Sequence, residues 1–120
     1  MIARSIGLAV VVVAAMPCEP ARAEDKRSVS PGIAAIYSYK NGKTASGEAA
    51  NPGRLTAAHR SLPFGTMVRV TNMRNGHTVV VRINDRGPFN RGRVIDVTPA
   101  AAKQLGFSGL TRVSLELVER

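Results

Sequence analysis

Three acidic residues, Glu48, Asp85 and Asp96, occupy positions from which a carboxylate could do chemistry. Each lies in or beside a turn at the end of a predicted strand, where a rigid sheet can hold a side chain at its rim. Two carboxylates held in this way suit cleavage of a glycosidic bond, because one acid protonates the leaving oxygen while a second group assists on the other side of the sugar. Spacing alone leaves another interpretation open for Asp85, that of a turn aspartate that caps its own backbone.

The histidines do not extend this set into a metal centre. His59 and His77 have no acidic or thiolate residues at the spacing of metal ligands, and His77 follows a predicted hairpin turn, where side chains are usually exposed. The sequence also shows no Ser-His-Asp order and no phosphate-binding loop. We therefore expect neither a metal nor a cofactor.

The elements that must position these residues are short strands separated by turns. Alternating apolar residues predict strands over residues 66–71, 79–83 and 113–117, and shorter apolar runs predict strands over 32–39 and 94–97. Residues 55–60 fit either a strand or a single turn. Asn75-Gly76 is a strong hairpin signal. Thr98 and Pro99 predict the start of a short helix, and Gly106 predicts its end. Many short strands with one short helix favour a small β-barrel.

The N-terminus resembles a secretory signal peptide. A short basic start precedes an apolar run over residues 6–16, and Ala21-Arg22-Ala23 offers small residues at the two positions that a signal peptidase recognises. We expect cleavage after Ala23, a flexible leader over residues 24–31 and a folded domain over 32–120. The run is shorter than the ~20 residues of a membrane-spanning helix. Cys18 is a weaker candidate for lipid attachment, because Pro17 directly precedes it and spoils the lipidation motif.

The mature chain would be small and strongly basic. Removal of 23 residues leaves 97, with 15 basic and 7 acidic residues and a net charge of +8. In an exported protein, such a high positive charge favours an anionic cell wall or a membrane surface, rather than nucleic acid, as the binding partner. A merely soluble basic surface stays open as an alternative. We expect a monomer that is at most peripheral to the membrane, in the periplasm or cell envelope.

Several separated blocks of the chain resemble the rare lipoprotein A family. They are "GKTASGE", "LTAAHRSLPFGTMVRVTN", "VVVRINDRGPF" and "GRVIDVTPAAAKQLG", which occur in the order of that family between about residues 32 and 118. The resemblance implies a mainly β fold, a six-stranded double-psi β-barrel with one or two short helices. It also implies a septal lytic transglycosylase that cleaves the glycan strands of peptidoglycan to 1,6-anhydro ends and prefers strands stripped of peptides.

The resemblance carries over to individual residues. It implies catalytic roles for Asp85, Glu48 and His59, with Asp85 as the acid and base. Asp96 matches an aspartate of the family and is predicted either to contact substrate or to be a structural acid, hydrogen-bonded inside the barrel mouth. Arg86 is expected to orient Asp85 or to touch substrate, or else to be a solvated turn arginine.

The chain also departs from the family pattern. It has no tryptophan, so Tyr37 must supply the sugar-stacking surface after the first strand, and Phe89 is expected to contact substrate as well. The family's C-terminal peptidoglycan-binding repeat does not occur before Arg120, which weakens the expectation of septal recruitment. Two alternatives stay open: an expansin-like module that binds wall polymers without cutting them, and a structural or inhibitory partner of other wall enzymes.

Overall fold

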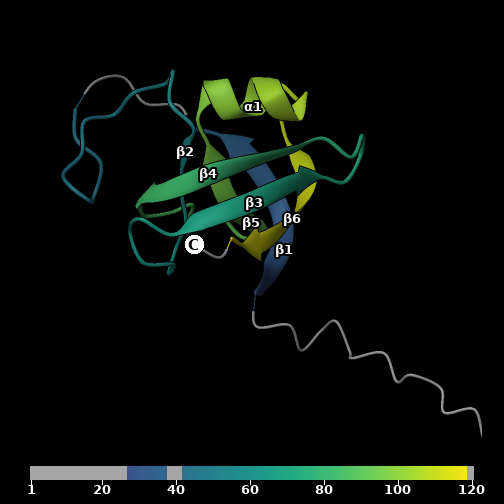
Figure 1. The fold of residues 1–120 in the computed structure, drawn as a ribbon, viewed down its shortest axis with the longest axis horizontal. Coiled ribbons are helices and arrows are strands. Elements are labelled where there is room, and N and C mark those ends of the chain that lie inside the picture. The colour runs from purple at the N-terminus through teal and green to yellow at the C-terminus, as the bar shows by residue number, and fades with distance from the viewer. Residues whose placement is uncertain (1–26, 38–41, 119–120) are drawn as a thin grey trace, which may run out of the picture.

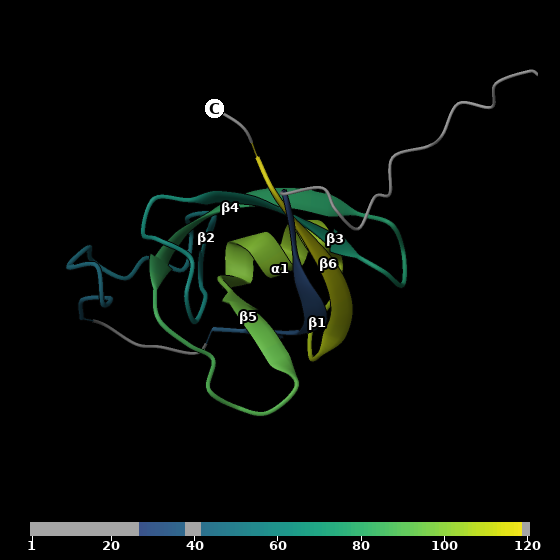
Figure 2. The ribbon, with the colours of Figure 1, turned by 90° about the horizontal axis from the view of Figure 1, so that it is seen from below.

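The computed structural model describes residues 27–37 and 42–118. The predicted signal peptide and Cys18 lie outside these residues. The described chain forms six strands and one helix (Figure 1): β1 Ser28–Ile36, β2 Thr56–Ala58, β3 Met67–Asn72, β4 Thr78–Asp85, β5 Arg93–Val97, α1 Pro99–Leu105 and β6 Thr111–Leu117. The strands close into a barrel in the order β1-β5-β2-β4-β3-β6, which Figure 2 shows as a ring. The predicted closed, mainly β fold is confirmed.

Parallel and antiparallel pairings together close this barrel. β1 runs parallel to β5, and β2 runs parallel to β4. The other neighbours are antiparallel: β1 with β6, β2 with β5, β3 with β4 and β3 with β6. Closure gives every strand two hydrogen-bonded neighbours, so the short sheet has no open edge. The predicted hairpin joins β3 and β4, and Gly76 in its turn has φ +81°, a conformation that favours glycine.

The barrel core follows from the alternation in the strands. Val79, Val81 and Ile83 of β4 point inward and are buried, while Arg82 between them points outward. The inward side chains of the other strands and of α1 complete one core cluster: Ala34, Ala57, Val68, Val70, Ile95, Val97, Ala101, Ala102, Leu105, Val113 and Leu115. The core holds β4 and its neighbours rigid up to the points where Asp85 and Asp96 occur.

Helix α1 lies across one end of the barrel (Figures 1 and 2). It starts and stops as the sequence predicts. The Thr98 side chain accepts a hydrogen bond from the Ala101 backbone N–H and donates one of 2.6 Å to the Arg54 carbonyl, while Gly106 ends the helix at φ +77°. The threonine therefore ties the start of the helix to the segment that leads into β2.

The N-terminal boundary of the barrel differs from the prediction. β1 begins at Ser28 rather than at residue 32, because Ser28 and Val29 pair with Glu116 and Leu115 of β6. The predicted leader over residues 24–31 is therefore wrong in its second half, and the folded domain starts earlier than expected. β1 ends at Ile36, and residues 38–41 lie outside the described part, including the last two of the predicted strand. Within the described residues, no helix has the length and apolar character needed to cross a membrane.

Candidate active site

The loop over residues 43–49 lies beside the end of β4 and carries the first predicted acid. It is closed on itself by hydrogen bonds from the Thr44 N–H to the Glu48 carbonyl (2.8 Å) and from the Gly47 N–H to the Thr44 carbonyl (2.9 Å). Gly47 has φ +93°, which this tight turn requires. The Thr44 hydroxyl is a further donor to the Glu48 carbonyl, at 3.0 Å. This closed loop holds Glu48 against the outer face of β4.

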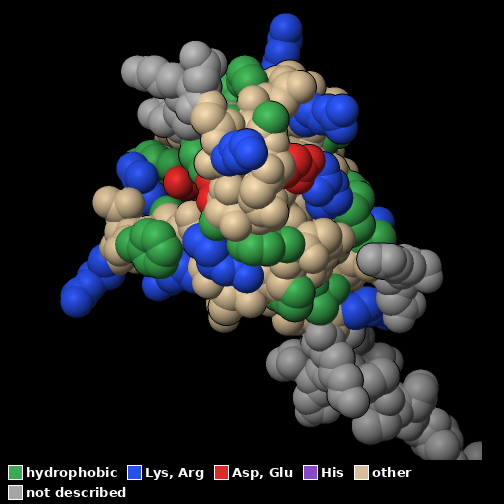
Figure 3. Space-filling model, turned by 90° about the vertical axis from the view of Figure 1, so that its left-hand side faces the viewer, with side chains coloured by type: hydrophobic (Ala, Val, Ile, Leu, Met, Phe, Trp, Pro, Cys, Tyr) green, Lys and Arg blue, Asp and Glu red, His purple; other side chains and the backbone are tan. Residues whose placement is uncertain are grey.

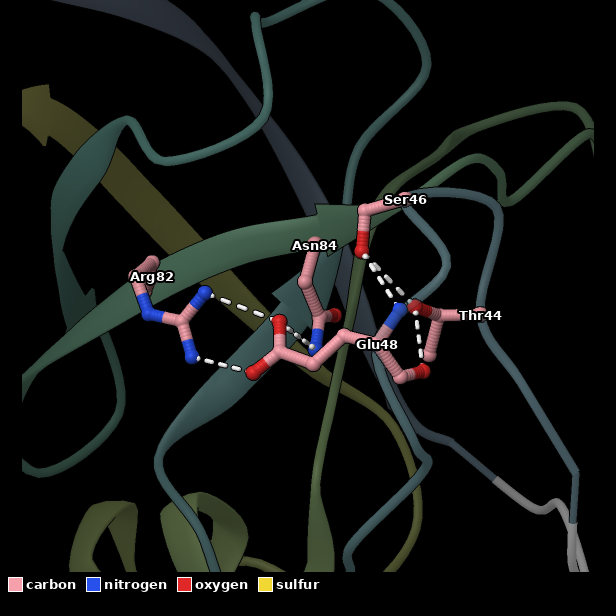
Figure 4. Close-up of polar contacts among 5 residues, drawn as sticks. All are labelled: Thr44, Ser46, Glu48, Arg82 and Asn84. Atoms are coloured by element: carbon pink, nitrogen blue, oxygen red, sulfur yellow. Dashed lines mark hydrogen bonds and ion pairs between the residues drawn. The ribbon is translucent and has the colours of Figure 1, made fainter.

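Glu48 is bound to β4 through its carboxylate (Figure 4). The Arg82 guanidinium donates two hydrogen bonds to it, of 2.9 and 2.6 Å, and the Asn84 amide donates a third of 3.3 Å. The Arg82 hydrogen bonds lower the pKa of Glu48 to about 2, against a smaller opposing effect of burial. Glu48 is thus ionised across the physiological range and cannot serve as a proton donor. Its geometry is that of a positioning residue.

The sequence did not single out Arg82 and Asn84 as parts of the site. The signal was present, because residues two apart in a strand share one face. In the predicted strand over residues 79–83, Arg82 lies on the face opposite to the apolar residues, and Asn84 follows on the same face. What the sequence could not show is that Glu48, more than 30 residues earlier, folds back onto that pair.

Asp85 is the last residue of β4 and is only 9% exposed. Its Oδ1 accepts hydrogen bonds from the backbone N–H groups of Ala45 and Arg86, each 2.8 Å long. Its Oδ2 has no hydrogen-bond partner among the described residues. One oxygen is therefore fixed by the backbone while the other stays available. Since Ala45 belongs to the same loop as Glu48, the two predicted acids meet at one end of β4.

Asp96 lies two strands away on the same row of the sheet. Ala58 in β2 is the pairing partner of both Asp85 in β4 and Asp96 in β5. The register of β2 and β4 shifts between Ala57 and Ala58, and a spacing of ~4.8 Å per strand puts the Cα atoms of the two acids about 10 Å apart. A row of three residues thus connects the two carboxylates.

The environment of Asp96 does not match a hydrogen-bonded structural acid. Its Oδ1 is buried and has no hydrogen-bond partner in the described part of the chain. Burial raises the pKa of Asp96, and the positive charge of Arg93 opposes that rise. A buried polar atom without a partner is costly, so each such atom in a folded protein calls for a physical explanation. The alternative of a structural acid, hydrogen-bonded inside the barrel mouth, is therefore wrong for Oδ1 of Asp96.

His59 directly follows β2, and its backbone N–H donates to the Asp85 carbonyl at 3.1 Å. Its ring Nδ1 accepts hydrogen bonds from the backbone N–H groups of Ser61 (3.1 Å) and Leu62 (3.2 Å), which places the ring proton on Nε2. Burial, and then the charges of Arg60 and Arg86, lower the pKa of His59. The ring is therefore a neutral hydrogen-bond donor, and Nε2 has no partner among the described residues. This geometry suits positioning better than general base catalysis.

Arg86 is bound to the backbone and not to the Asp85 carboxylate. Its Nη1 donates to the carbonyls of His59 (3.2 Å) and Leu62 (2.9 Å), and its guanidinium lies 4.1 Å from the centre of the Phe64 ring. The alternative of a solvated turn arginine is therefore wrong. The Arg86 side chain thus shapes the segment 59–62, while its backbone N–H binds Oδ1 of Asp85 directly. In the sequence, Phe64 is distinguished only as an aromatic residue near a turn.

The two predicted aromatic contacts differ in exposure. Phe89 follows the turn after β4 and is 76% exposed, so its ring is open to a ligand. Tyr37 directly follows β1, is half-buried, and its backbone N–H donates to the Val97 carbonyl at 2.7 Å.

Among residues 27–37 and 42–118, no three His, Cys, Asp or Glu side chains gather to hold a metal ion.

A protein-family model described as lytic transglycolase matches residues 29–116, a stretch that contains all seven predicted site residues. The chain belongs to this family. The lytic transglycolase match spans all six strands of the barrel, and it agrees with the resemblance to rare lipoprotein A that the sequence blocks indicate.

Curated relatives support the same assignment. The chain is 59% identical over 95 residues to a "probable endolytic peptidoglycan transglycosylase RlpA" of Nostoc, which covers 74% of this chain and 26% of that protein. A protein of the same name in Synechocystis is 53% identical, covering 78% and 30%. The "endolytic peptidoglycan transglycosylase RlpA" of Escherichia coli K12 is 47% identical, covering 78% and 26%. The chain thus spans between a quarter and a third of the length of these relatives.

Solved structures confirm the double-psi barrel. A Streptomyces papain inhibitor aligns with a TM-score of 0.61 at 22% identity, covering 75% of this chain and 94% of that one. The apo expansin of Clavibacter michiganensis aligns with a TM-score of 0.58 at 26% identity, covering 74% and 50%. A mutant of that expansin, solved in complex with cellohexaose, aligns with the same TM-score at 25% identity and covers the same shares of the two chains.

Proposed function

We propose that this protein is an endolytic peptidoglycan lytic transglycosylase that cuts peptide-poor glycan strands to 1,6-anhydro-muramic acid ends. One observation carries the proposal: the carboxylate of Asp85 is held through Oδ1 by two backbone N–H groups, while Oδ2 is unpartnered among the described residues. A group fixed in this way can transfer a proton without first being reoriented. The family and the names of the curated relatives support the same chemistry.

The reaction needs one acid that later acts as a base. Asp85, in its protonated form, donates its proton to the glycosidic oxygen, and the bond between that oxygen and the anomeric carbon of muramic acid breaks. The resulting carboxylate then accepts the proton of the muramic acid 6-hydroxyl, whose oxygen bonds to the same anomeric carbon. No water is consumed, and Asp85 ends in the protonated form in which it began.

The other polar residues hold the acid and the sugar in place. Glu48 fixes the loop whose Ala45 N–H binds Asp85, and Arg86 fixes the segment around His59. Asp96, with an unpartnered oxygen on the same row of the sheet, accepts a hydrogen bond from a sugar hydroxyl or donates one when protonated.

Aromatic rings complete the proposed groove. The exposed ring of Phe89 and the ring of Tyr37 stack on sugar faces and replace the missing tryptophan. Because general acid–base catalysis depends on alignment within a fraction of an ångström, residues that never touch substrate still affect turnover strongly.

The expansin-like alternative also has support. The chain shares its barrel with the expansin of Clavibacter michiganensis at a TM-score of 0.58, and one structure of that protein contains cellohexaose. Under this alternative the same face binds glycan without cutting it. We favour the enzyme, because the curated relatives that carry the transglycosylase name are about twice as similar in sequence as that expansin.

We further propose that the protein is exported, cleaved after Ala23 and active as a monomer on the cell wall. Its partners are then peptidoglycan glycan strands and, through them, other wall enzymes. The apolar run over residues 6–16 and the net charge of +8 on the mature chain support this location and these partners.

Mass spectrometry of muropeptides separates the candidate activities. The purified mature protein is incubated with intact peptidoglycan and with peptide-free glycan strands, and the soluble products are identified. Products with 1,6-anhydro ends establish the transglycosylase, and products with reducing ends identify a hydrolase instead. An unchanged profile together with co-sedimentation of protein and peptidoglycan supports the expansin-like alternative.

A further inference from the structure

A second cleft opens beside His59, next to the proposed catalytic acid. It has a volume of about 420 Å³ and lies between the start of β1, Val94 of β5 and the segment 59–62. Part of its wall is apolar, formed by Val29, Leu62 and Val94. The other residues that line it are polar: Ser30, His59, Arg60 and Ser61.

The polar part of the cleft offers hydrogen-bond donors and positive charge. Arg60 uses one nitrogen, Nη2, to bind the Arg93 carbonyl at 3.1 Å, so its guanidinium is held in place while its other N–H groups stay available. No Asp or Glu among the described residues pairs with Arg60 or lines this cleft. His59 also lines the cleft, and its Nε2–H is an unused donor among the described residues, because Nδ1 is used by backbone N–H groups. Such a site fits a carboxylate.

The cleft lies close enough to Asp85 to contact a substituent of the sugar residue that is bound there. His59 directly follows β2, and its backbone N–H donates at 3.1 Å to the carbonyl of Asp85, the last residue of the neighbouring strand β4. Neighbouring strands are separated by about 5 Å, roughly the width of one sugar ring. A substituent on the sugar bound at Asp85 can therefore reach the cleft.

We propose that this cleft binds the free lactyl group of muramic acid, with its carboxylate at Arg60 and its methyl group on the apolar wall. The proposal rests on the function proposed above and names the feature of the substrate that is recognised. A lactyl group that still carries a peptide ends in a neutral amide, which offers Arg60 no charge at this position. Recognition of the free carboxylate then accounts for a preference for peptide-free strands.

Binding of two chemically matched glycans tests this inference. The probes are peptide-free glycan strands and the same strands with their lactyl carboxylates converted to methylamides. Affinities are measured by calorimetry at 0.15 M salt in the Asp85→Asn background, so that the strands stay intact. The variants are Arg60→Gln and, as the matched control, Arg74→Gln, which removes one exposed arginine from a different cleft that includes the end of α1.

The Asp85→Asn protein is expected to bind the carboxylate strands about tenfold more tightly than the methylamide strands, on the scale of one charge-assisted hydrogen bond. Adding Arg60→Gln abolishes that preference, whereas adding Arg74→Gln preserves it. Arg60→Lys, which keeps the charge, retains part of the preference and serves if Arg60→Gln folds poorly. Equal affinity for the two glycans, or a preference that survives Arg60→Gln, overturns the inference. The proposed function is tested separately: if it is wrong, the wild type releases no anhydro-ended products from peptide-free glycan strands, whatever the binding experiment shows.

Discussion

Replacing Glu48 with Gln removes the charge from the most strongly hydrogen-bonded carboxylate of the site. Glu48 loses its ion pair with Arg82, so the loop over residues 43–49 is held less firmly against β4. The lowering of the Glu48 pKa from 4.5 to about 2 sets a ceiling of roughly 3 kcal/mol on the stabilisation. Both side chains are about a third exposed, so solvent screening reduces the expected loss of unfolding free energy to about 1 kcal/mol.

The pH dependence of this loss has a definite sign. A carboxylate whose pKa is depressed in the folded state stabilises the fold above its unfolded pKa, and this contribution disappears as the pH falls through the folded pKa. The unfolding free energy of the wild type should therefore exceed that of Glu48→Gln by the full amount above about pH 5, and this difference should vanish towards pH 2. Urea unfolding at several pH values measures it.

A double-mutant cycle isolates the pair from its surroundings. Glu48→Gln, Arg82→Gln and the double variant should show a coupling energy of about 1 kcal/mol at pH 6. If Glu48 is a positioning residue, the two single variants lower turnover to a similar degree and leave the shape of its pH profile unchanged. A normal turnover in Arg82→Gln beside an inactive Glu48→Gln would refute this reasoning, because Glu48 would then act on the substrate directly.

Three further predictions address other parts of the account. Asp96→Asn should lower turnover but leave the melting temperature at pH 7 unchanged or raised, because it removes a charge whose burial is unfavourable; a clear drop in melting temperature would restore the alternative of a structural acid. Binding to intact peptidoglycan, measured by co-sedimentation, should weaken steeply between low and high salt. Lys and Arg dominate the exposed charge on the face shown in Figure 3, and exposed charges are screened beyond about 10 Å at 0.1 M salt. Mass spectrometry of the mature protein should find an N-terminus near Glu24, whereas an acylated Cys18 would contradict that cleavage.

Local patterns in the sequence predicted most of the fold. The alternation over residues 79–83, the Asn75-Gly76 turn and the Thr98-Pro99 helix start depend on neighbouring residues, and all three occur as expected. The start of β1 was missed because its first four residues, Ser-Val-Ser-Pro, form no apolar run and lie in the sheet through pairing with β6, more than 80 residues away. Closure of the barrel likewise depends on long-range pairing that no local pattern contains.

The candidate site was predicted in its residues but not in its contacts. The sequence led to Glu48, Asp85 and Asp96 through their positions at strand ends, and the structure aligns the latter two across Ala58. The neutral state of His59 and the partners of Glu48 could not be predicted, because they depend on backbone N–H groups and on side chains brought together by the fold.

The central claim is that Asp85 transfers the proton that breaks the glycosidic bond, and one comparison tests it most directly. Wild type and Asp85→Asn are incubated with peptide-free glycan strands, and anhydro-ended products are quantified by mass spectrometry. The Asn side chain keeps the shape of the carboxylate but cannot transfer its proton, so the rate should fall by ~10²- to 10⁴-fold while the melting temperature and glycan binding stay close to those of the wild type. Equal rates of anhydro-product release from the two proteins would contradict the account.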